Sequence, residues 1–213
     1  MNLRIHSYFN KSFVEGPYTR FVIWVQGCSI RCPGCSNKHM WDFNEGYAVS
    51  IEDLYNIIND EEEIEGVTFV GGEPFDQAGA LALLAENIRR KKLGIVTFTG
   101  YKYEYLKYYG TEPQQALLEK TDLLIDGPFE LDNKMSDLPW VGSGNQRFIH
   151  LSDRYADFNF AEVHNKIEIR WDEEKNKIVL NGIMDDESIN AFTSQMRLKG
   201  FIRKDHGCPV KVI

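Results

Sequence analysis

The chain has 213 residues, an ordinary apolar content and a formal net charge of −8, so it can form one large domain or one domain with a small appendage. The acidic balance argues against nucleic acid as the main partner, because neutralising phosphates requires a basic surface. No apolar segment reaches the roughly 18 residues that span a membrane, and the first residues lack the apolar stretch of a signal peptide, so we expect no membrane association and a cytoplasmic location.

The first clear strand is expected at residues 21–25, whose continuous apolar side chains suit a strand covered on both faces. Residues 1–20 end in a turn-rich lead into this strand, from Glu15 to Arg20. Ser50 and Asp53 form a capping-box pattern. That pattern predicts a helix through residues 54–58, where the apolar positions share one face.

Strands and helices alternate over the next hundred residues or so of the sequence. Such alternation indicates right-handed crossovers and a mostly parallel sheet. The strands are too few to close an eight-stranded barrel. The sequence therefore predicts an α/β fold, a partial, open (β/α) barrel. Its further strands are expected at residues 67–70, 95–98, 123–125 and 148–151, and its helices at 76–92 and 103–120.

A different pattern begins after about residue 153. Residues 167–171 and 177–180 are predicted to form a β-hairpin, and a helix is expected near residues 187–199. We therefore divide the chain into a partial barrel at residues 1–155 and a small C-terminal ββα appendage at residues 156–213.

Four unusual loops follow the ends of predicted strands. In an α/β fold the carboxyl ends of parallel strands lie on one side of the sheet. One site could therefore gather all four loops, which are Cys28 to Cys35, Gly71 to Pro74, Thr99 to Tyr101 and Asp126 to Pro128.

Three of the four cysteines lie in the first of these loops, as Cys28, Cys32 and Cys35, with the spacing Cys-x3-Cys-x2-Cys. Clustered thiols indicate a reducing compartment and a cofactor site rather than a disulfide scaffold. The spacing leaves three interpretations. One is a [4Fe-4S] cluster held by three thiolates, with one iron open to another ligand.

The other two interpretations explain fewer of these thiols. Structural zinc needs a fourth ligand, for which the chain offers His39, His206 or Cys208, and three ligands in one loop are unusual for zinc. A thioredoxin-like pair of Cys32 and Cys35 leaves the remaining thiol of the loop unexplained.

The three-cysteine motif after the first strand of a partial barrel, with Gly71-Gly72-Glu73-Pro74 after the second, resembles the radical S-adenosylmethionine enzymes. Within that family, the chain is most similar to the activating proteins of anaerobic ribonucleotide reductases, over residues 8–152. The segments that carry this closer resemblance are Gly16-Pro17, Thr19-Arg20, Gly27-Cys28, Cys32 to Cys35, Asn37-Lys38, Trp41, Thr99 to Tyr101, Asp126 to Phe129, Gly142-Ser143 and Asn145-Gln146.

The resemblance implies two cofactors, a [4Fe-4S] cluster and S-adenosylmethionine. Cys28, Cys32 and Cys35 would each ligate one iron. Gly71 and Gly72 would let the backbone approach the methionine part of the cofactor. Glu73 would orient the amino group of the methionine part, and Pro74 would stiffen the turn.

Four further residues have a structural alternative beside their implied role. Thr99 and Asp126 would contact the carboxylate end of the cofactor or a nearby cation, but they could equally cap helices. Asn145 would reach ribose or adenine, although a turn of this composition also favours Asn for backbone reasons. Arg20 would pair with a carboxylate, or lie exposed at the entry to its strand.

The resemblance also implies an activity. A 5′-deoxyadenosyl radical would abstract a hydrogen atom from a glycine of a large glycyl radical enzyme, with a flavodoxin- or ferredoxin-like protein as the electron donor. One alternative is a radical enzyme that acts directly on a small molecule or peptide, with the appendage shaping its pocket. Another is a non-catalytic Fe–S or zinc protein that uses the appendage as a binding module.

Overall fold

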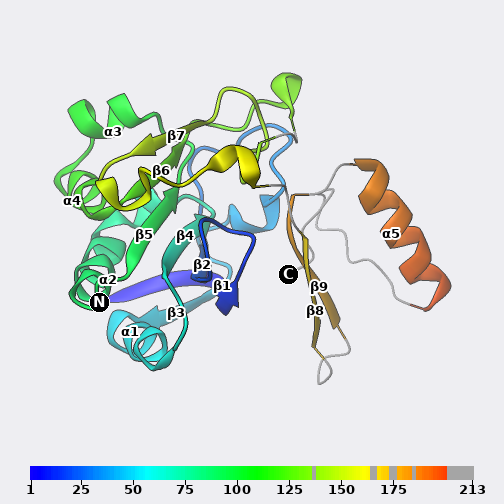
Figure 1. The fold of residues 1–213 in the computed structure, drawn as a ribbon, viewed down its shortest axis with the longest axis horizontal. Coiled ribbons are helices and arrows are strands. Elements are labelled where there is room, and N and C mark those ends of the chain that lie inside the picture. The colour runs from blue at the N-terminus through cyan, green and yellow to red at the C-terminus, as the bar shows by residue number, and fades with distance from the viewer. Residues whose placement is uncertain (136–137, 164–166, 173–176, 184–185, 201–213) are drawn as a thin grey trace.

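The computed structural model describes residues 1–135, 138–163, 167–172, 177–183 and 186–200 (Figure 1). A seven-stranded sheet, in the order β3-β1-β2-β4-β5-β6-β7, forms the body of the protein. No helix among these residues is long and apolar enough to cross a membrane. The strands of this sheet are β1 (Asn2–Ser12), β2 (Arg20–Val25), β3 (Tyr47–Ser50), β4 (Gly66–Gly71), β5 (Gly94–Phe98), β6 (Leu123–Asp126) and β7 (Arg147–His150).

Strands β2, β4, β5 and β6 are parallel, whereas β1, β3 and β7 join the sheet antiparallel to their neighbours. The sheet is therefore mixed and open, with the predicted parallel strands at its centre. The predicted alternation of strands and helices is confirmed. The helices of the body are α1 (Ile51–Asp60), α2 (Ala78–Arg90), α3 (Tyr103–Tyr109) and α4 (Glu112–Lys120).

The predicted turn-rich lead into β2 is present, with bends at residues 13–19, but the sequence analysis did not identify β1, which precedes it. Leu3 and Ile5 are fully buried, but polar residues interrupt the alternation further along the strand. The pairing with β2 also has two register shifts, after Ile5 and after Phe9. Bulges of this kind break the two-residue period that identifies a strand in sequence.

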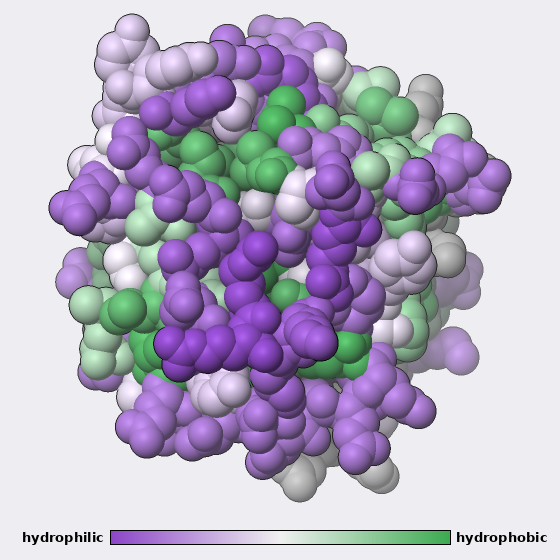
Figure 2. Space-filling model, turned by 60° about the vertical axis from the view of Figure 1, so that its left-hand side comes forward, coloured by the Kyte–Doolittle hydropathy of each residue, from purple (hydrophilic) through white to green (hydrophobic). Residues whose placement is uncertain are grey.

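Helices α1, α2 and α4 cover one face of the sheet (Figure 1). Their buried positions pack with alternate residues of the parallel strands, such as Ile23, Phe69 and Leu124, in the main hydrophobic core. Figure 2 turns this side of the molecule forward and shows a mostly hydrophilic surface with small apolar areas. The helices are thus amphipathic, as their sequence period predicts.

The other face of the sheet carries the remaining alternate residues, including Trp24 and Ile125. Loops and partly buried aromatic side chains cover it instead of helices. Met40 packs against Trp24, and Tyr155 packs with Ile125. The nearby aromatic side chains are Trp140, Phe148, Phe158 and Phe160.

The C-terminal segment forms the expected hairpin and helix, β8 (Ile167–Asp172), β9 (Lys177–Gly182) and α5 (Asp186–Leu198). The hairpin is a separate two-stranded sheet. It contacts the end of β1, where Ser12 Oγ donates to Glu168 at 2.8 Å and Arg170 lies over the Phe9 ring. The boundary between residues 155 and 156 stays a prediction.

Candidate functional site

The cysteine loop begins where β2 ends, and its base is closed by hydrogen bonds. The Gly27 N–H donates to the Met40 carbonyl at 2.8 Å, and the Cys28 N–H donates to the Trp41 carbonyl at 3.1 Å. Gln26 is fully buried, and its side-chain amide donates to the carbonyl of Asp42 at 2.8 Å. The segment that carries the thiols is therefore a closed loop held at the carboxyl end of a central strand.

The three thiols differ in exposure. Cys28 is buried, whereas Cys32 and Cys35 are partly exposed. Burial raises the pKa of the Cys28 thiol to about 11, and it also raises the pKa of Cys32. Without a metal cation these two thiols keep their protons at neutral pH, and binding a cation releases them.

Backbone N–H groups are directed at the sulfur atoms. The clearest is the Asn37 N–H, which donates to Cys35 Sγ at 3.3 Å. Hydrogen bonds of this kind favour the thiolate form and are one means by which proteins tune iron–sulfur clusters. The donors are Ile30 and Arg31 for Cys28, Phe129 for Cys32, and Asn37 for Cys35.

Gly71 and Gly72 lie tightly against the strand and loop that precede the thiols. A Cβ at Gly72 would stand 2.2 Å from the Gly27 carbonyl oxygen. Gly71 has a φ of +109°, and a Cβ there would stand 2.8 Å from the Val25 nitrogen. Both glycines are thus required by packing within the protein. Their contact with the methionine part of the cofactor stays a prediction.

The buried Glu73 carboxylate joins two of the strand-end turns. Oε1 accepts hydrogen bonds from the Phe75 N–H at 2.9 Å and the Thr99 hydroxyl at 2.8 Å. Oε2 accepts one from the Gly100 N–H at 2.9 Å. Burial raises the pKa of Glu73 to about 7, and these donors lower it in part. Pro74 follows as the first residue of a short 3-10 helix.

Asp126 makes three hydrogen bonds within the protein. It accepts a hydrogen bond from the Tyr103 N–H at 2.7 Å, at the start of α3. The Arg147 guanidinium donates to both of its oxygens, at 3.0 and 2.5 Å. The same guanidinium also bonds Glu104. Of the two roles foreseen for Asp126, the helix-capping one agrees with these contacts.

Asn145 lies beside the turn that follows β6. Its side-chain amide donates to the Pro128 carbonyl at 2.7 Å. Its Oδ1 is buried and has no hydrogen-bond partner among the residues that the structure describes. A buried acceptor without a donor is costly, so this atom is suited to accept a hydrogen bond from a ligand.

The loops after β2, β4, β5 and β6 are therefore brought together at one edge of the sheet. Gly100 lies against Ile30 of the cysteine loop, and Phe129 lies against Gly34. The Thr99 N–H donates to the Ile125 carbonyl at 2.9 Å. Direct contacts thus connect neighbouring loops of the predicted site.

The sequence analysis gave no role at this edge to Asp76 or Arg147. Asp76 stands only two residues after Pro74, so its place next to a motif could have singled it out. Arg147 gave no such signal for its contact with Asp126, because the two lie far apart in sequence. Cys208 and His206 lie outside the described residues.

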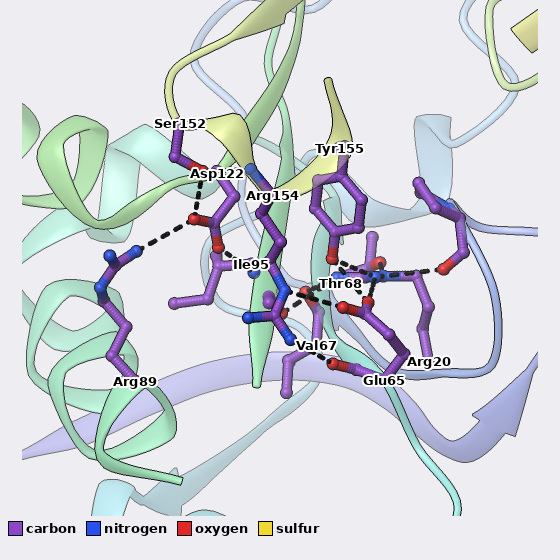
Figure 3. A network of polar contacts seen from close by, with 12 residues as sticks. Arg20, Glu65, Val67, Thr68, Arg89, Ile95, Asp122, Ser152, Arg154 and Tyr155 are labelled. Carbon is purple, nitrogen blue, oxygen red and sulfur yellow. Dashed lines mark hydrogen bonds and ion pairs between the residues drawn. The ribbon is translucent and has the colours of Figure 1, made fainter. Parts of the chain in front are cut away.

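Arg20 is not part of this edge, although it belongs to one of the motifs of the resemblance. It is fully buried at the opposite end of the strand, where its guanidinium donates to Glu65 at 2.8 Å and to Thr68 at 2.6 Å (Figure 3). Of the two expectations for Arg20, pairing with a carboxylate is confirmed. The exposed position at the strand entry is wrong.

The donor set fits an iron–sulfur cluster. The three thiols come from one loop and are free of disulfides, and thiolates are the usual ligands of such clusters. A cluster binds each thiolate through a different iron, so its ligands stand further apart than those of one ion. Among the residues the structure describes, no three His, Cys, Asp or Glu side chains surround a point that could hold a single metal ion.

Comparisons with known proteins agree with this chemistry. The model of the 4Fe-4S single cluster domain matches residues 14–149. The anaerobic ribonucleoside-triphosphate reductase-activating protein of Escherichia coli strain K12 is 34% identical over 157 residues, which cover 70% of this chain and 99% of that protein. The protein of the same name from Vibrio cholerae is 33% identical, covering 68% and 96%.

Two further similarities are more distant. The activating protein of the same name from enterobacteria phage T4 is 30% identical over 141 residues, which cover 63% of this chain and 86% of that protein. The crystal structure of QueE from Escherichia coli aligns with a TM-score of 0.43 and 18% identity, covering 59% of this chain and 71% of that chain.

Proposed function

The chain belongs to the radical S-adenosylmethionine family of 4Fe-4S enzymes, and from this premise we propose that it activates a glycyl radical enzyme. The observation that carries the proposal is the match to activating proteins over nearly their whole length. The substrate would be a glycine of a large partner enzyme, such as an anaerobic ribonucleotide reductase. Its Cα–H bond would break, leaving a glycyl radical on the partner.

The cofactor supplies the radical chemistry and the protein supplies binding and orientation. When bound, the cluster and S-adenosylmethionine supply a 5′-deoxyadenosyl radical, formed together with methionine when one electron cleaves the sulfonium. Cys28, Cys32 and Cys35 would hold three irons as thiolates. Their proton release on binding follows from the raised pKa values of Cys28 and Cys32.

The neighbouring turns would hold the organic cofactor. Glu73 accepts three hydrogen bonds, and a carboxylate can accept about four. One acceptor position therefore stays available for the amino group of the methionine part. Asn145 Oδ1, buried and without a partner, would accept a hydrogen bond from ribose or adenine. Thr99 would act through Glu73, since its hydroxyl donates to that carboxylate.

The reaction needs one electron from outside the chain. A flavodoxin- or ferredoxin-like protein is the donor we propose, in the reducing cytoplasm, where thiols stay free. The partly exposed Cys32 and Cys35 support this route, because they would place one side of the cluster near the surface.

The direct test is glycyl radical formation. The protein is reconstituted anaerobically with iron and sulfide, then mixed with S-adenosylmethionine, a reductant and the anaerobic ribonucleotide reductase encoded in the same genome. We expect the electron paramagnetic resonance signal of a glycyl radical on the reductase, and about one 5′-deoxyadenosine per radical. Cys35→Ala serves as the inactive control.

Another result would contradict the proposal. If the reconstituted protein cleaves S-adenosylmethionine but gives no glycyl radical on the reductase, the activating function is wrong. Turnover of a small molecule in the absence of any protein partner would then favour a radical enzyme that acts directly on its substrate.

A further inference from the structure

The cysteine loop is fastened to the short 3-10 helix before α2, Pro74–Gln77, by a carboxylate that no motif of the family resemblance includes. Asp76 Oδ2 accepts a hydrogen bond from the Ser29 N–H at 2.7 Å, and Oδ1 accepts one from the Ser29 hydroxyl at 2.9 Å. Tyr101 adds a third, since its hydroxyl donates to Oδ1 at 3.2 Å. Ser29 and Tyr101 are also within 3.2 Å of each other.

These contacts join three loops of the site at one point. Ser29 follows Cys28 in the cysteine loop, Asp76 follows the Gly71 to Pro74 turn, and Tyr101 ends the turn after β5. The Ser29 N–H belongs to the peptide bond that joins Ser29 directly to Cys28. Fixing that N–H therefore fixes the peptide plane that orients the Cys28 side chain.

The other residues between the first two cysteines are also held. Ile30 lies against Gly100, and the Arg31 side chain donates to the Cys28 carbonyl at 3.4 Å. Arg31 has a φ of +53°, a conformation that a residue with a side chain keeps only when its surroundings hold it there. Direct contacts thus fix the path of the chain from Cys28 to Cys32.

We infer that Asp76 is a positioning residue, which sets the direction of Cys28 and the charge beside the cluster through Ser29 and Tyr101. The inference rests on the proposed radical chemistry, but it concerns the cluster and requires no partner enzyme. Partners of metal ligands commonly change metal affinity or activity about 10- to 100-fold when they are altered.

Charge and hydrogen bonding act in a defined direction. A carboxylate near the cluster opposes the addition of an electron, so it makes the reduction potential more negative. A more negative potential gives a more strongly reducing cluster, which favours cleavage of the sulfonium.

The test uses the full chain with Asp76→Asn, Asp76→Glu, Tyr101→Phe and Ser29→Ala. Three properties are measured: the midpoint potential of the cluster, the rate of 5′-deoxyadenosine formation without a partner enzyme, and hydrogen exchange in the peptide that contains Ser29. The matched control is Asp53→Asn. It removes the same kind of Ser–Asp contact from the start of α1, where Asp53 bonds Ser50.

We expect Asp76→Asn to shift the midpoint potential to a less negative value and to slow 5′-deoxyadenosine formation about tenfold. Easier reduction combined with slower cleavage is a signature that simple loss of stability does not produce. Asp76→Glu should recover part of both effects, because it restores the charge. Tyr101→Phe and Ser29→Ala should show smaller changes in the same direction.

Two outcomes would overturn the inference. One is a wild-type potential and a wild-type cleavage rate in Asp76→Asn. The other applies if Asp76→Asn takes up no cluster. In that case, a wild-type potential and a wild-type cleavage rate in both Tyr101→Phe and Ser29→Ala would contradict the inference. Hydrogen exchange at Ser29 tests the contact even in protein without a cluster. A missing glycyl radical on a partner would contradict only the activating function, since none of these measurements uses the partner.

Discussion

The two edges of the parallel sheet are both rich in polar residues, but they are built differently. At the amino edge, charged and hydroxyl groups form a network in which buried donors meet acceptors (Figure 3). At the carboxyl edge lie three thiols and an Asn145 oxygen that has no partner. The comparison shows which edge is saturated by internal contacts and which retains the capacity to bind a ligand.

The amino edge is organised around Arg20. The five N–H groups of its guanidinium face six acceptors, including Tyr155 at 2.8 Å and the Gly94 carbonyl at 3.1 Å. Glu65 balances its charge and also bonds Arg154 at 2.7 Å. The starts of β2, β4 and β5 are held together in this way. Such a network contributes specificity and stability, with no group left for chemistry.

The carboxyl edge gathers two groups with perturbed pKa values around its loops. Burial raises the pKa of Glu73 to about 7 and that of Cys28 to about 11. Perturbed groups gathered around loops are typical of functional sites. The four predictions below test this contrast, beginning with the largest expected effect.

Cys35→Ala should abolish cluster binding and S-adenosylmethionine cleavage, because one iron loses its thiolate. The free energy of unfolding of the metal-free protein should change by less than about 1 kcal/mol, since Cys35 is only partly buried. Iron content and 5′-deoxyadenosine yield give the measurement. Cys208→Ala is the control and should keep its iron. If Cys35→Ala still binds the full amount of iron, Cys35 is not a ligand of the cluster.

Arg20→Met should destabilise the protein by about 3 to 5 kcal/mol, because the buried acceptors around Arg20 would lose their donor and Glu65 would keep only Arg154 as a partner charge. Chemical denaturation measures the change. Arg90→Met is a suitable control, since the Arg90 side chain is 71% exposed. It should change the free energy of unfolding by less than about 0.5 kcal/mol. If Arg20→Met and Arg90→Met lower the free energy of unfolding by the same small amount, the network at the amino edge does not stabilise the protein.

Glu73 should make the stability of the metal-free protein depend on pH. Its pKa is about 7 in the folded state against 4.5 for the free group, so the folded state binds more protons between these values. Stability is then fully present below about pH 4.5 and is lost as the pH rises through about 7, by about 3 kcal/mol.

The measurement is the free energy of unfolding between about pH 5 and pH 8, compared with Glu73→Gln. The variant should lose this part of the pH dependence, whatever its absolute stability. If both proteins show the same slope, Glu73 keeps an ordinary pKa and the burial argument is wrong.

Tyr155→Phe should have the smallest effect, about 1 to 2 kcal/mol of stability. The change removes a hydroxyl that donates to Glu65 at 2.6 Å and accepts from Arg20. The rate of S-adenosylmethionine cleavage should be unchanged in the folded protein. Tyr109→Phe, at a tyrosine that is 77% exposed, is the control. If Tyr155→Phe is fully stable but cleaves S-adenosylmethionine more slowly, the amino edge also affects the chemistry of the carboxyl edge.

Much of the fold could be predicted from the sequence because the central strands are locally distinct. The apolar residues of β2, for example, stand in one continuous run, and the run ends directly at the cysteine loop. Strand β1 could not be identified in the same way, since its register shifts mix buried and exposed residues. It is fixed by pairing with β2 and β3, which lie later in the chain.

The site shows the same division. Cys28, Cys32 and Cys35 could be selected from the sequence, because thiols at this spacing are rare outside metal and redox sites. The sequence singled out Arg20 and Asp126 as candidates, but it did not show which residues they contact. The first bonds Thr68 across two strands, and the second bonds Arg147 across twenty-one residues of chain. Contacts between distant residues depend on how the strands are ordered.

The sequence by itself determined the order of strands and helices, the three-thiol loop and the side of the sheet on which the loops meet. These follow from local period, turn chemistry and the direction of parallel strands. Only the tertiary structure decided which polar residues serve the site and which serve the frame. Arg20 and Asp76 illustrate this, since both stand beside motifs, yet packing places one at the amino edge and the other beside Cys28.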